Sequence, residues 1–341
     1  MNNYQESLYN FSTIKEIFEI PDSRDTFYSK ASKGIEVPHP IKSNKQGYRY
    51  WNISDLAKIG ETYSQLASPN SGLAPIINFY VSKGGGSHKT TDAFNLATFL
   101  GIHGKKVLIV GLDFQLNISK KFNIDNSRTS IASTGVSYNS MYEILANHIP
   151  VEEAIYKTEF PNVYIIPESS NLVRLEAWLL SETKREIKIK KILDGLRSDF
   201  DAIIIDNNPS WSQVSMNALF ACDVNIASIG VDSNTLDALP QFFDTLEQAE
   251  VNLEENLLVL GMTENNSFKT QSRLDIKNQF GDICLGVDIR KSPKVDEANS
   301  LHLPVILHDP KSPVADDYRK VCNEIWGRAV LIKNKIDSNK I

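Results

Sequence analysis

Apolar residues in this chain gather into short continuous runs that alternate with longer segments of helical spacing. The runs cover residues 76–81, 106–112, 163–166, 202–205, 224–229, 257–262 and 283–289. Their hydrophobicity is continuous rather than alternating, which predicts an α/β fold with a mostly parallel sheet buried between helices on both faces. Because such sheets bind ligands at the carboxyl ends of their strands, we expect the functional residues there.

The first 66 residues follow a different pattern of short helices and one hairpin. Ser12 and Ser23 are predicted to cap the starts of two helices, and Gly34 to end the second. Residues 43–51 predict a tight hairpin leading into an aromatic strand, and a third helix follows Asn52. The predicted domains are a small, mainly helical module at 1–66, a linker at 67–75, an α/β domain at 76–330 and a polar tail at 331–341.

Composition is that of an ordinary globular protein, with 41% apolar and 23% charged residues and a net charge of −6. The apolar runs are shorter than the roughly 18 residues of a membrane-spanning helix. The first residues lack the basic and apolar regions of a signal peptide. Three scattered cysteines without C-x-x-C spacing fit a reducing compartment. We therefore expect a cytoplasmic protein with no membrane partner.

The turn between the first apolar run and the helical segment after it is rich in glycine. Glycines let backbone N–H groups approach a phosphate, and a helix N-terminus favours anions. As in a P-loop, Lys89 is placed to reach the outer phosphates and Thr90 to hold Mg²⁺. A plain surface turn is the alternative, because His88 stands where the P-loop pattern has glycine. The predicted nucleotide-binding residues are Gly84, Gly85, Gly86, Ser87, His88, Lys89, Thr90 and Thr91.

Two aspartates stand at the ends of predicted strands. Asp113 follows the run at 106–112, and Asp206 follows the run at 202–205. An acid at such a position holds Mg²⁺ in P-loop enzymes. A strand-ending turn or a helix cap also favours aspartate, so neither residue decides alone. The two together, after a glycine-rich loop, favour a nucleotide and metal site.

Basic residues are enriched in the second half of the N-terminal module. Residues 24–49 hold six basic side chains against two acidic ones. This excess suits contacts with DNA phosphates through a helix and a wing. A module that only packs or dimerises is the alternative. The candidate DNA contacts here are Arg24, Lys30, Lys45 and Arg49.

Several motifs in the same order resemble the ParA-type partition ATPases, the deviant-Walker group that also includes MinD. The likeness covers about residues 75–328. The motifs are Lys83-Gly84-Gly85 with Lys89-Thr90-Thr91, Asp113-Phe114-Gln115, Asp206-Asn207-Asn208-Pro209-Ser210, Asn217-Ala218-Leu219, Glu297-Ala298 and Leu303-Pro304-Val305. The N-terminal module resembles the winged helix-turn-helix of MerR-like proteins. Together the two parts are most similar to long plasmid ParA proteins, which repress their own operon.

The resemblance implies an ATPase that uses ATP/ADP and Mg²⁺ and dimerises on ATP. Lys83 would contact the nucleotide of the partner in a homodimer, and Asp113 would orient the attacking water. Thr90 and Asp206 would hold the metal and its water shell. The catalytic set is Lys83, Lys89 and Asp113. The resemblance also implies non-specific DNA binding, with Arg273, Lys277 and Arg290 as candidate contacts, a ParB-type centromere-binding partner, and association with the nucleoid.

Three departures from the family pattern bear on activity. Lys83 lies six residues before Lys89, where the family has five, His88 replaces a glycine, and Gly111 replaces a commonly acidic residue. We expect ATP binding to be retained and turnover to be weak and stimulated by the partner. Two rival functions are a MinD-like positioning ATPase that uses residues 319–341 as a membrane-surface helix, and a nucleotide-gated transcription regulator with little hydrolysis.

Overall fold

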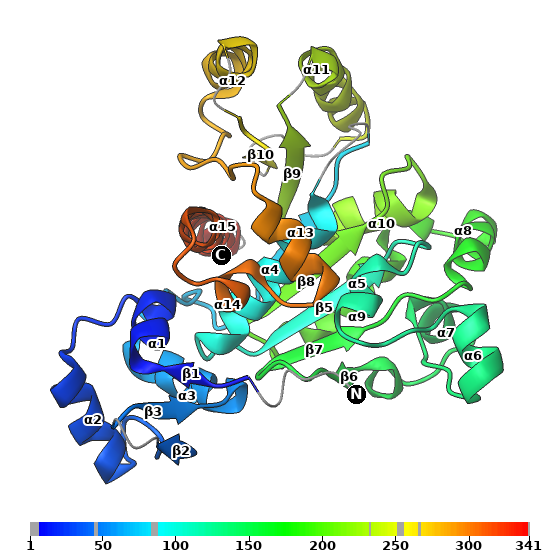
Figure 1. Cartoon of the computed structure of the whole chain (residues 1–341). Coiled ribbons are helices and arrows are strands. Elements are labelled where there is room, and N and C mark those ends of the chain that lie inside the picture. The colour runs from blue at the N-terminus through cyan, green and yellow to red at the C-terminus, as the bar shows by residue number, and fades with distance from the viewer. Residues whose placement is uncertain are drawn as a thin grey trace.

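The computed structural model describes residues 7–43, 47–82, 88–231, 233–250, 256–264 and 267–339. In this part of the chain seven strands form one large sheet in the order β10-β9-β4-β8-β5-β7-β6 (Figure 1). All neighbours are parallel except β6 and β7. The strands are β4 (Ile76–Phe79), β5 (Val107–Leu112), β6 (Tyr156–Lys157), β7 (Val163–Ile166), β8 (Ala202–Asn207), β9 (Val224–Gly230) and β10 (Asn256–Gly261). The predicted α/β fold with a mostly parallel sheet is confirmed.

Neighbouring residues of one strand enter different apolar clusters, which explains the continuous hydrophobic runs. Val107 and Ile109 of β5 pack with α4 and α15, whereas Leu108 and Val110 pack with helices α7 to α10. A third cluster joins the strands β9 and β10 to α11 and α12. The helices are α4 (Lys89–Ile102), α5 (Asn117–Lys121), α6 (Arg128–Thr134), α7 (Met141–Ala146), α8 (Leu172–Ser181), α9 (Lys188–Leu196), α10 (Gln213–Ala221), α11 (Ser233–Gln248), α12 (Ser267–Phe280), α13 (Pro293–Ser300), α14 (Val305–His308) and α15 (Pro313–Ser338).

The apolar run at 283–289 is not a strand, contrary to the prediction. Among the described residues it forms one isolated bridge to β10, between Leu258 and Cys284. The backbone N–H of Gly286 donates instead to the Glu324 carboxylate on α15, at 2.9 and 3.0 Å. The Leu285 N–H donates to the Leu258 carbonyl, and the next donor to β10 is the Ile289 N–H, which donates to the Leu260 carbonyl. Four residues of this segment thus span two residues of β10, which breaks the regular ladder.

The N-terminal module contains two helices, a small sheet and a third helix, in the predicted order. Its elements are β1 (Tyr9–Asn10), α1 (Phe11–Phe18), α2 (Arg24–Lys33), β2 (Lys42–Ser43), β3 (Arg49–Trp51) and α3 (Ile53–Tyr63). Ser23 caps α2 and Gly34 ends it at φ 67°, as predicted. The cap of α1 is Asn10 rather than Ser12, because the Asn10 side chain accepts from the Thr13 N–H at 3.1 Å.

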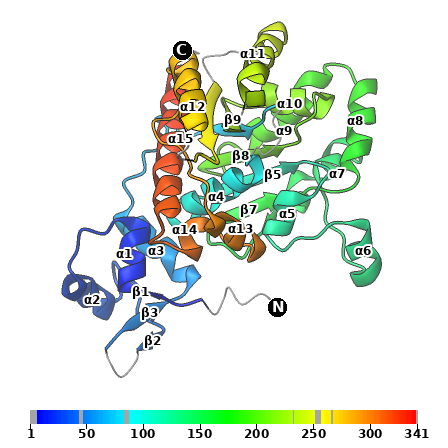
Figure 2. The same ribbon diagram turned by 45° about the horizontal axis from the view of Figure 1, so that its top comes forward.

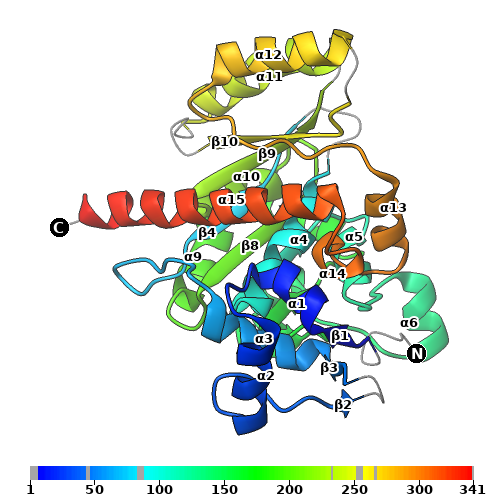
Figure 3. The same ribbon diagram turned by 60° about the vertical axis from the view of Figure 1, so that its left-hand side comes forward.

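The module is packed firmly onto the large domain. Its buried residues and those of α4 and α15 belong to one continuous apolar cluster. Helix α3 approaches the end of α4 so closely that a Cβ at Gly60 would lie 1.9 Å from the Ile102 carbonyl oxygen. The following segment runs along α15, where Trp326 Nε1 donates to the Ala67 carbonyl at 2.9 Å (Figure 3). Residues 67–75 therefore connect two parts that share a core.

Helix α15 continues to Ser338, through most of the segment predicted as a polar tail at 331–341. Its apolar side, including Ile325, Trp326 and Ala329, is buried against the domain, as Figure 2 shows for the long helix beside α4 and the module. Packing holds the helix together past residue 330, because Val330 and Lys333 are also buried. Among the described residues, the helices fall short of the length and apolarity that crossing a membrane requires.

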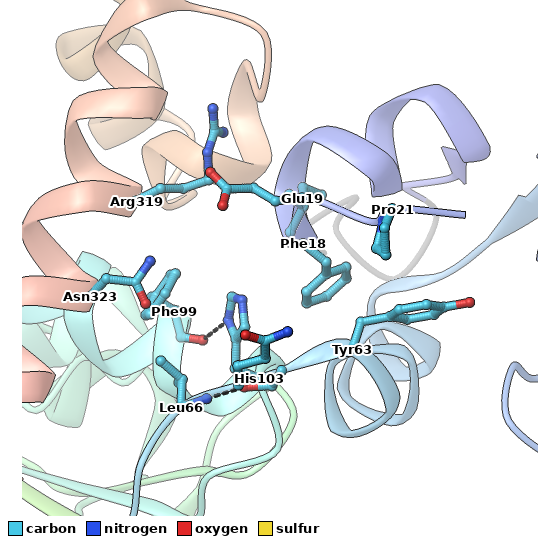
Figure 4. A pocket seen from close by; sticks show the side chains of 12 residues that line it. Phe18, Glu19, Pro21, Tyr63, Leu66, Phe99, His103, Arg319 and Asn323 are labelled. Carbon is cyan, nitrogen blue, oxygen red and sulfur yellow. Dashed lines mark hydrogen bonds between the residues drawn. The ribbon is translucent and has the colours of Figure 1, made fainter. Parts of the chain in front are cut away.

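A cavity of about 300 Å³ lies where the module meets α4 and α15 (Figure 4). His103, just after α4, stands at its wall with its ring 4.1 Å from that of Phe99 and 5.0 Å from that of Phe18. The His103 Nδ1 donates to the Phe99 carbonyl at 2.7 Å. Burial lowers the pKa of His103 to about 4, so the ring is neutral in the folded protein at neutral pH.

We expect this histidine to make the junction sensitive to acid. Its folded pKa lies below the ordinary value near 6.5, so the unfolded chain takes up the proton first as the pH falls. The free energy of unfolding is therefore unaffected by the protonation of His103 above about pH 6.5. It falls as the pH drops toward 4, by about 2 kcal/mol at pH 4.5. Replacing His103 with phenylalanine should remove this share of the loss. Thermal unfolding of both proteins at pH 7.5 and 4.5 measures it, and equal losses in the two proteins would contradict the expectation.

Candidate functional site

The glycine-rich loop joins β4 to the start of α4. Lys83, Gly84, Gly85, Gly86 and Ser87 lie outside the described residues, so their predicted roles stay predictions. Lys89 is the first residue of α4, where backbone N–H groups point outward and attract anions. A strand, a loop and a helix beginning at a lysine are the layout of a P-loop.

Lys89 is buried among three aspartates. Burial lowers the pKa of its ammonium group, and the negative charges of Asp206, Asp113 and Asp92 counteract this effect. Asp206 belongs to β8, which is a neighbour of β4 in the sheet. Asp113 follows β5, which lies one strand further. The structure therefore brings together the lysine and the two strand-end aspartates that the sequence singled out.

Asp206 is fully buried inside β8, level with Phe79 of β4 and Gly111 of β5. Burial raises the pKa of its carboxyl, while the nearby Thr90 hydroxyl and the Lys89 charge lower it. Neither carboxylate oxygen has a partner at hydrogen-bond distance within the described residues. A buried carboxylate in this state is costly unless a cation or water completes it. These oxygens and the Thr90 hydroxyl fit Mg²⁺, a cation that prefers oxygen ligands and retains waters.

Asp113 stands just beyond β5, almost completely buried. Its Oδ1 accepts from the Gln115 N–H at 3.0 Å, which fixes the carboxylate within its turn. Burial raises the pKa of Asp113, and the Gln115 bond and the Lys89 charge lower it. The carboxylate is thus fixed within reach of the Lys89 charge, and a carboxylate held in this way is able to act on a water molecule.

His88 and Thr91 contact residues of β10 and α13. The His88 ring packs over Gly261, where an added Cβ would lie 3.2 Å from the imidazole Cδ2. Burial lowers the pKa of His88, against the effect of the Asp296 charge. The Thr91 hydroxyl lies 3.5 Å from the Asn299 Oδ1 on α13. The bulky residue in place of a glycine is accommodated because β10 ends in a glycine beneath it.

Two further charged residues lie at this site and were not among the residues predicted for it. Lys121, at the end of α5, donates to the Asn299 Oδ1 at 2.6 Å, and burial lowers its pKa to about 8 despite the charges of Asp206 and Asp92. Glu168 is fully buried, and burial together with the Asp206 charge raises its pKa. Glu168 follows the run at 163–166 much as Asp113 follows its own run, so the same signal predicts it. Lys121 belongs to no motif.

In the N-terminal module, two of the predicted DNA contacts are engaged within the protein. Lys30 forms ion pairs with Asp22 at 3.1 Å and Glu36 at 2.9 Å. The Arg49 guanidinium stacks on Tyr28 and donates to its carbonyl at 2.9 Å. Arg24 is exposed in the first turn of α2, and Lys45 lies outside the described residues.

The three predicted contacts of the large domain come together beside one surface hollow. Arg273 and Lys277 of α12 both form ion pairs with the Asp288 carboxylate. Arg290 binds Asp317 through two hydrogen bonds of 2.6 and 2.8 Å. This hollow is lined by the basic residues Arg273, Arg290, Lys291 and Lys320, and we call it the basic hollow. Its acidic partners offset much of the positive charge that the sequence suggests.

The fold and this site define a P-loop nucleoside triphosphatase. A family model described as an AAA domain (AAA_31) matches residues 74–259. The chromosome partitioning protein ParA of Caulobacter vibrioides is 30% identical over 251 residues, which are 72% of this chain and 91% of that protein. The sporulation initiation inhibitor protein Soj of Bacillus subtilis is 28% identical over 246 residues, covering 71% of this chain and 94% of Soj. The chain belongs to the ParA/Soj family of partition ATPases.

Solved structures support the same fold. A putative plasmid partition protein of Borrelia burgdorferi bound to AMPPNP is 24% identical, covers 75% of this chain and 99% of its own, and has a TM-score of 0.61. The septum site-determining protein MinD of Pyrococcus horikoshii, complexed with Mg-ADP, is also 24% identical, with 76% and 99% coverage and a TM-score of 0.60. As a member of this family the chain is a P-loop ATPase, a class whose cofactors are ATP or ADP and Mg²⁺.

Proposed function

We propose that the chain is an ATP-dependent DNA partition ATPase that dimerises on ATP and binds DNA without sequence preference. The observation that carries the proposal is the buried cluster of Lys89, Asp113 and Asp206 at the carboxyl ends of the central strands. In this proposal the protein acts in the cytoplasm, on the nucleoid. A ParB-type protein is the partner that stimulates its ATP turnover. Membership of the ParA/Soj family supports this proposal.

The residues of the cluster divide the work on ATP. Lys89 and the start of α4 bind the outer phosphates. Thr90 and Asp206 hold Mg²⁺, which when bound neutralises charge on the phosphate oxygens. Asp113 orients the attacking water, since positioning supplies most of phosphoryl-transfer catalysis. Lys83, from the loop outside the described residues, is proposed to contact the partner's nucleotide across the homodimer.

Exposed aromatic side chains beside the site support a homodimer. Phe114 is 45% exposed and directly follows Asp113. Trp211 is 44% exposed and lies four residues beyond β8. Large apolar side chains that remain exposed next to a functional site are typical of a protein interface. Burial of both on dimer formation would place the two nucleotides between the subunits.

The membrane alternative receives no support from α15, because the apolar side of this helix already packs on the domain.

We propose instead that the N-terminal module binds operator DNA and makes the protein an autorepressor. Helix α2 with its exposed Arg24, and the hairpin of β2 and β3, are the surfaces that support this function. Binding assays with ATP, with ADP and without nucleotide test the switch. DNA binding that is identical in all three states would contradict it.

We expect the basic hollow to carry part of the non-specific DNA binding. Lys291 and Lys320 are more than half exposed, so their ammonium groups can reach DNA phosphates while paired to a carboxylate. Replacing both with alanine should weaken binding to all sequences alike and lower the slope of log K against log salt by about 2. Lys157→Ala, on β6 at the opposite edge of the sheet, is the matched control. An unchanged salt slope in the double variant would move the DNA surface elsewhere.

A further inference from the structure

The Glu168 side chain, beyond β7, fills the space that a side chain at Gly111 in β5 would need. A Cβ added at Gly111 would lie 2.3 Å from the Glu168 Cγ and 2.9 Å from the Ile118 Cγ2. Real Cβ atoms essentially never come within 3 Å of such neighbours, so a side chain at position 111 and the observed Glu168 exclude each other. The glycine of β5 therefore makes room for the glutamate that arrives from the neighbouring strand.

Glu168 is held at this place by the short helix that follows Asp113. Its Oε2 accepts from the Ser119 N–H at 3.0 Å, and its own N–H donates to the Ser119 Oγ at 2.8 Å. The Asn126 side chain also donates to the Glu168 carbonyl at 3.1 Å. The side chain is fully buried. A backbone N–H thus holds its carboxylate in place, as the Gln115 N–H holds that of Asp113.

The surroundings of Glu168 are incomplete in the same way as those of Asp206. The Glu168 Oε1 and both Asp206 oxygens are buried and have no partner at hydrogen-bond distance within the described residues. The charges acting most strongly on Glu168 are those of Asp206 and Asp113, which repel it. Buried carboxylates that repel one another and keep unpartnered oxygens are costly unless a cation or its waters complete them.

We propose that Glu168 is a positioning residue for Mg²⁺ at the ATP site: seated in the space that Gly111 leaves open, its carboxylate adds to Asp206 the second buried negative charge that holds the hydrated cation. The inference rests on the nucleotide and metal site proposed above and is independent of DNA binding. Carboxylates that accept hydrogen bonds from the waters of a bound ion orient those waters and strengthen metal binding.

A purely structural role is the competing explanation, since Glu168 also anchors α5 through Ser119. Glu168→Gln separates the two roles, because glutamine keeps the length of the side chain and an acceptor for the Ser119 N–H but carries no charge. Ser119→Ala is the converse control. It removes the hydroxyl that accepts from the Glu168 N–H and leaves the carboxylate in place.

The test measures Mg²⁺ affinity without relying on turnover. A fluorescent ADP analogue is titrated onto the full-length protein in EDTA and at graded Mg²⁺, and Mn²⁺ binding to the ADP complex is followed by electron paramagnetic resonance. In Glu168→Gln we expect the half-saturating metal concentration to rise about 10-fold or more, with ADP affinity in EDTA unchanged. Ser119→Ala should keep the wild-type metal dependence. A wild-type metal dependence in Glu168→Gln would overturn the inference.

Moving the carboxylate between the two strands gives a second, independent test. Gly111→Asp alone should lower the melting temperature, because its side chain meets Glu168. The double variant Gly111→Asp with Glu168→Ala should recover both the melting temperature and most of the metal affinity lost in Glu168→Ala. A stable double variant that binds metal as weakly as Glu168→Ala would contradict the proposal. If the wild-type protein itself binds no ADP with or without Mg²⁺, the proposed function fails instead.

Discussion

Replacing Lys89 with glutamine is expected to abolish detectable ATP turnover and to weaken nucleotide binding by about 100-fold or more. The ammonium group is buried at the start of α4 and faces Asp206, Asp113 and Asp92. Without it, these carboxylates would repel the phosphates that the lysine attracts. Binding of a fluorescent ATP analogue and release of inorganic phosphate, each with and without DNA, measure the two losses.

Asp113→Asn is the matched control for this result. The asparagine can keep the bond from the Gln115 N–H but cannot accept a proton from water. We expect nucleotide binding close to that of the wild type, with turnover lowered about 100-fold or more. Equal loss of binding in the two variants would mean that Lys89 acts only by holding the fold together. Wild-type turnover in Lys89→Gln would remove the basis of the proposed function.

Gly60→Ala is expected to lower the free energy of unfolding by about 3 kcal/mol and to loosen the N-terminal module. The new methyl group would lie 1.9 Å from the Ile102 carbonyl oxygen, an atom of the backbone that cannot turn aside. Helix α3 would have to shift away from α4, which opens the apolar cluster shared by the two parts. Denaturant unfolding measures the cost, and limited proteolysis at residues 64–75 reports the loosening.

Gly327→Ala provides the control for the change in helix propensity. Gly327 lies inside α15, where an added Cβ meets no atom of the described residues within 4 Å. This variant should gain about 0.5–1 kcal/mol, since glycine is unfavourable in a helix interior. A similar gain in Gly60→Ala would show that the module is not packed against α4 in solution.

Much of the large domain was predictable because its signals are local. Continuous apolar runs predicted six of the seven strands of the large sheet, and the acids Asp113 and Asp206 at their ends predicted the place of the candidate site. The remaining strand, β6, has only two residues and leaves no recognisable pattern. The run at 283–289 has the composition of a strand, but its pairing with β10 is interrupted between Leu285 and Ile289.

The charged residues were harder to assign from the sequence. Lys30 and Arg49 carry the charge expected of DNA contacts, yet the structure engages them with Asp22, Glu36 and Tyr28. Which acid meets a given base depends on packing between segments far apart in the chain. For the same reason, the positive excess of residues 24–49 overstates the charge that the module presents to solvent.

The α/β fold, the buried lysine at the start of α4 and the two strand-end aspartates could be read from the chain alone, because each depends on residues close together in it. Three relations became visible in the folded molecule alone: Glu168 fills the space beside Gly111, Lys121 approaches Asp206, and the N-terminal module shares a core with α4 and α15. These relations join segments separated by many residues. Steric exclusion and charge act through space, so they are settled when the sheet and its helices are assembled.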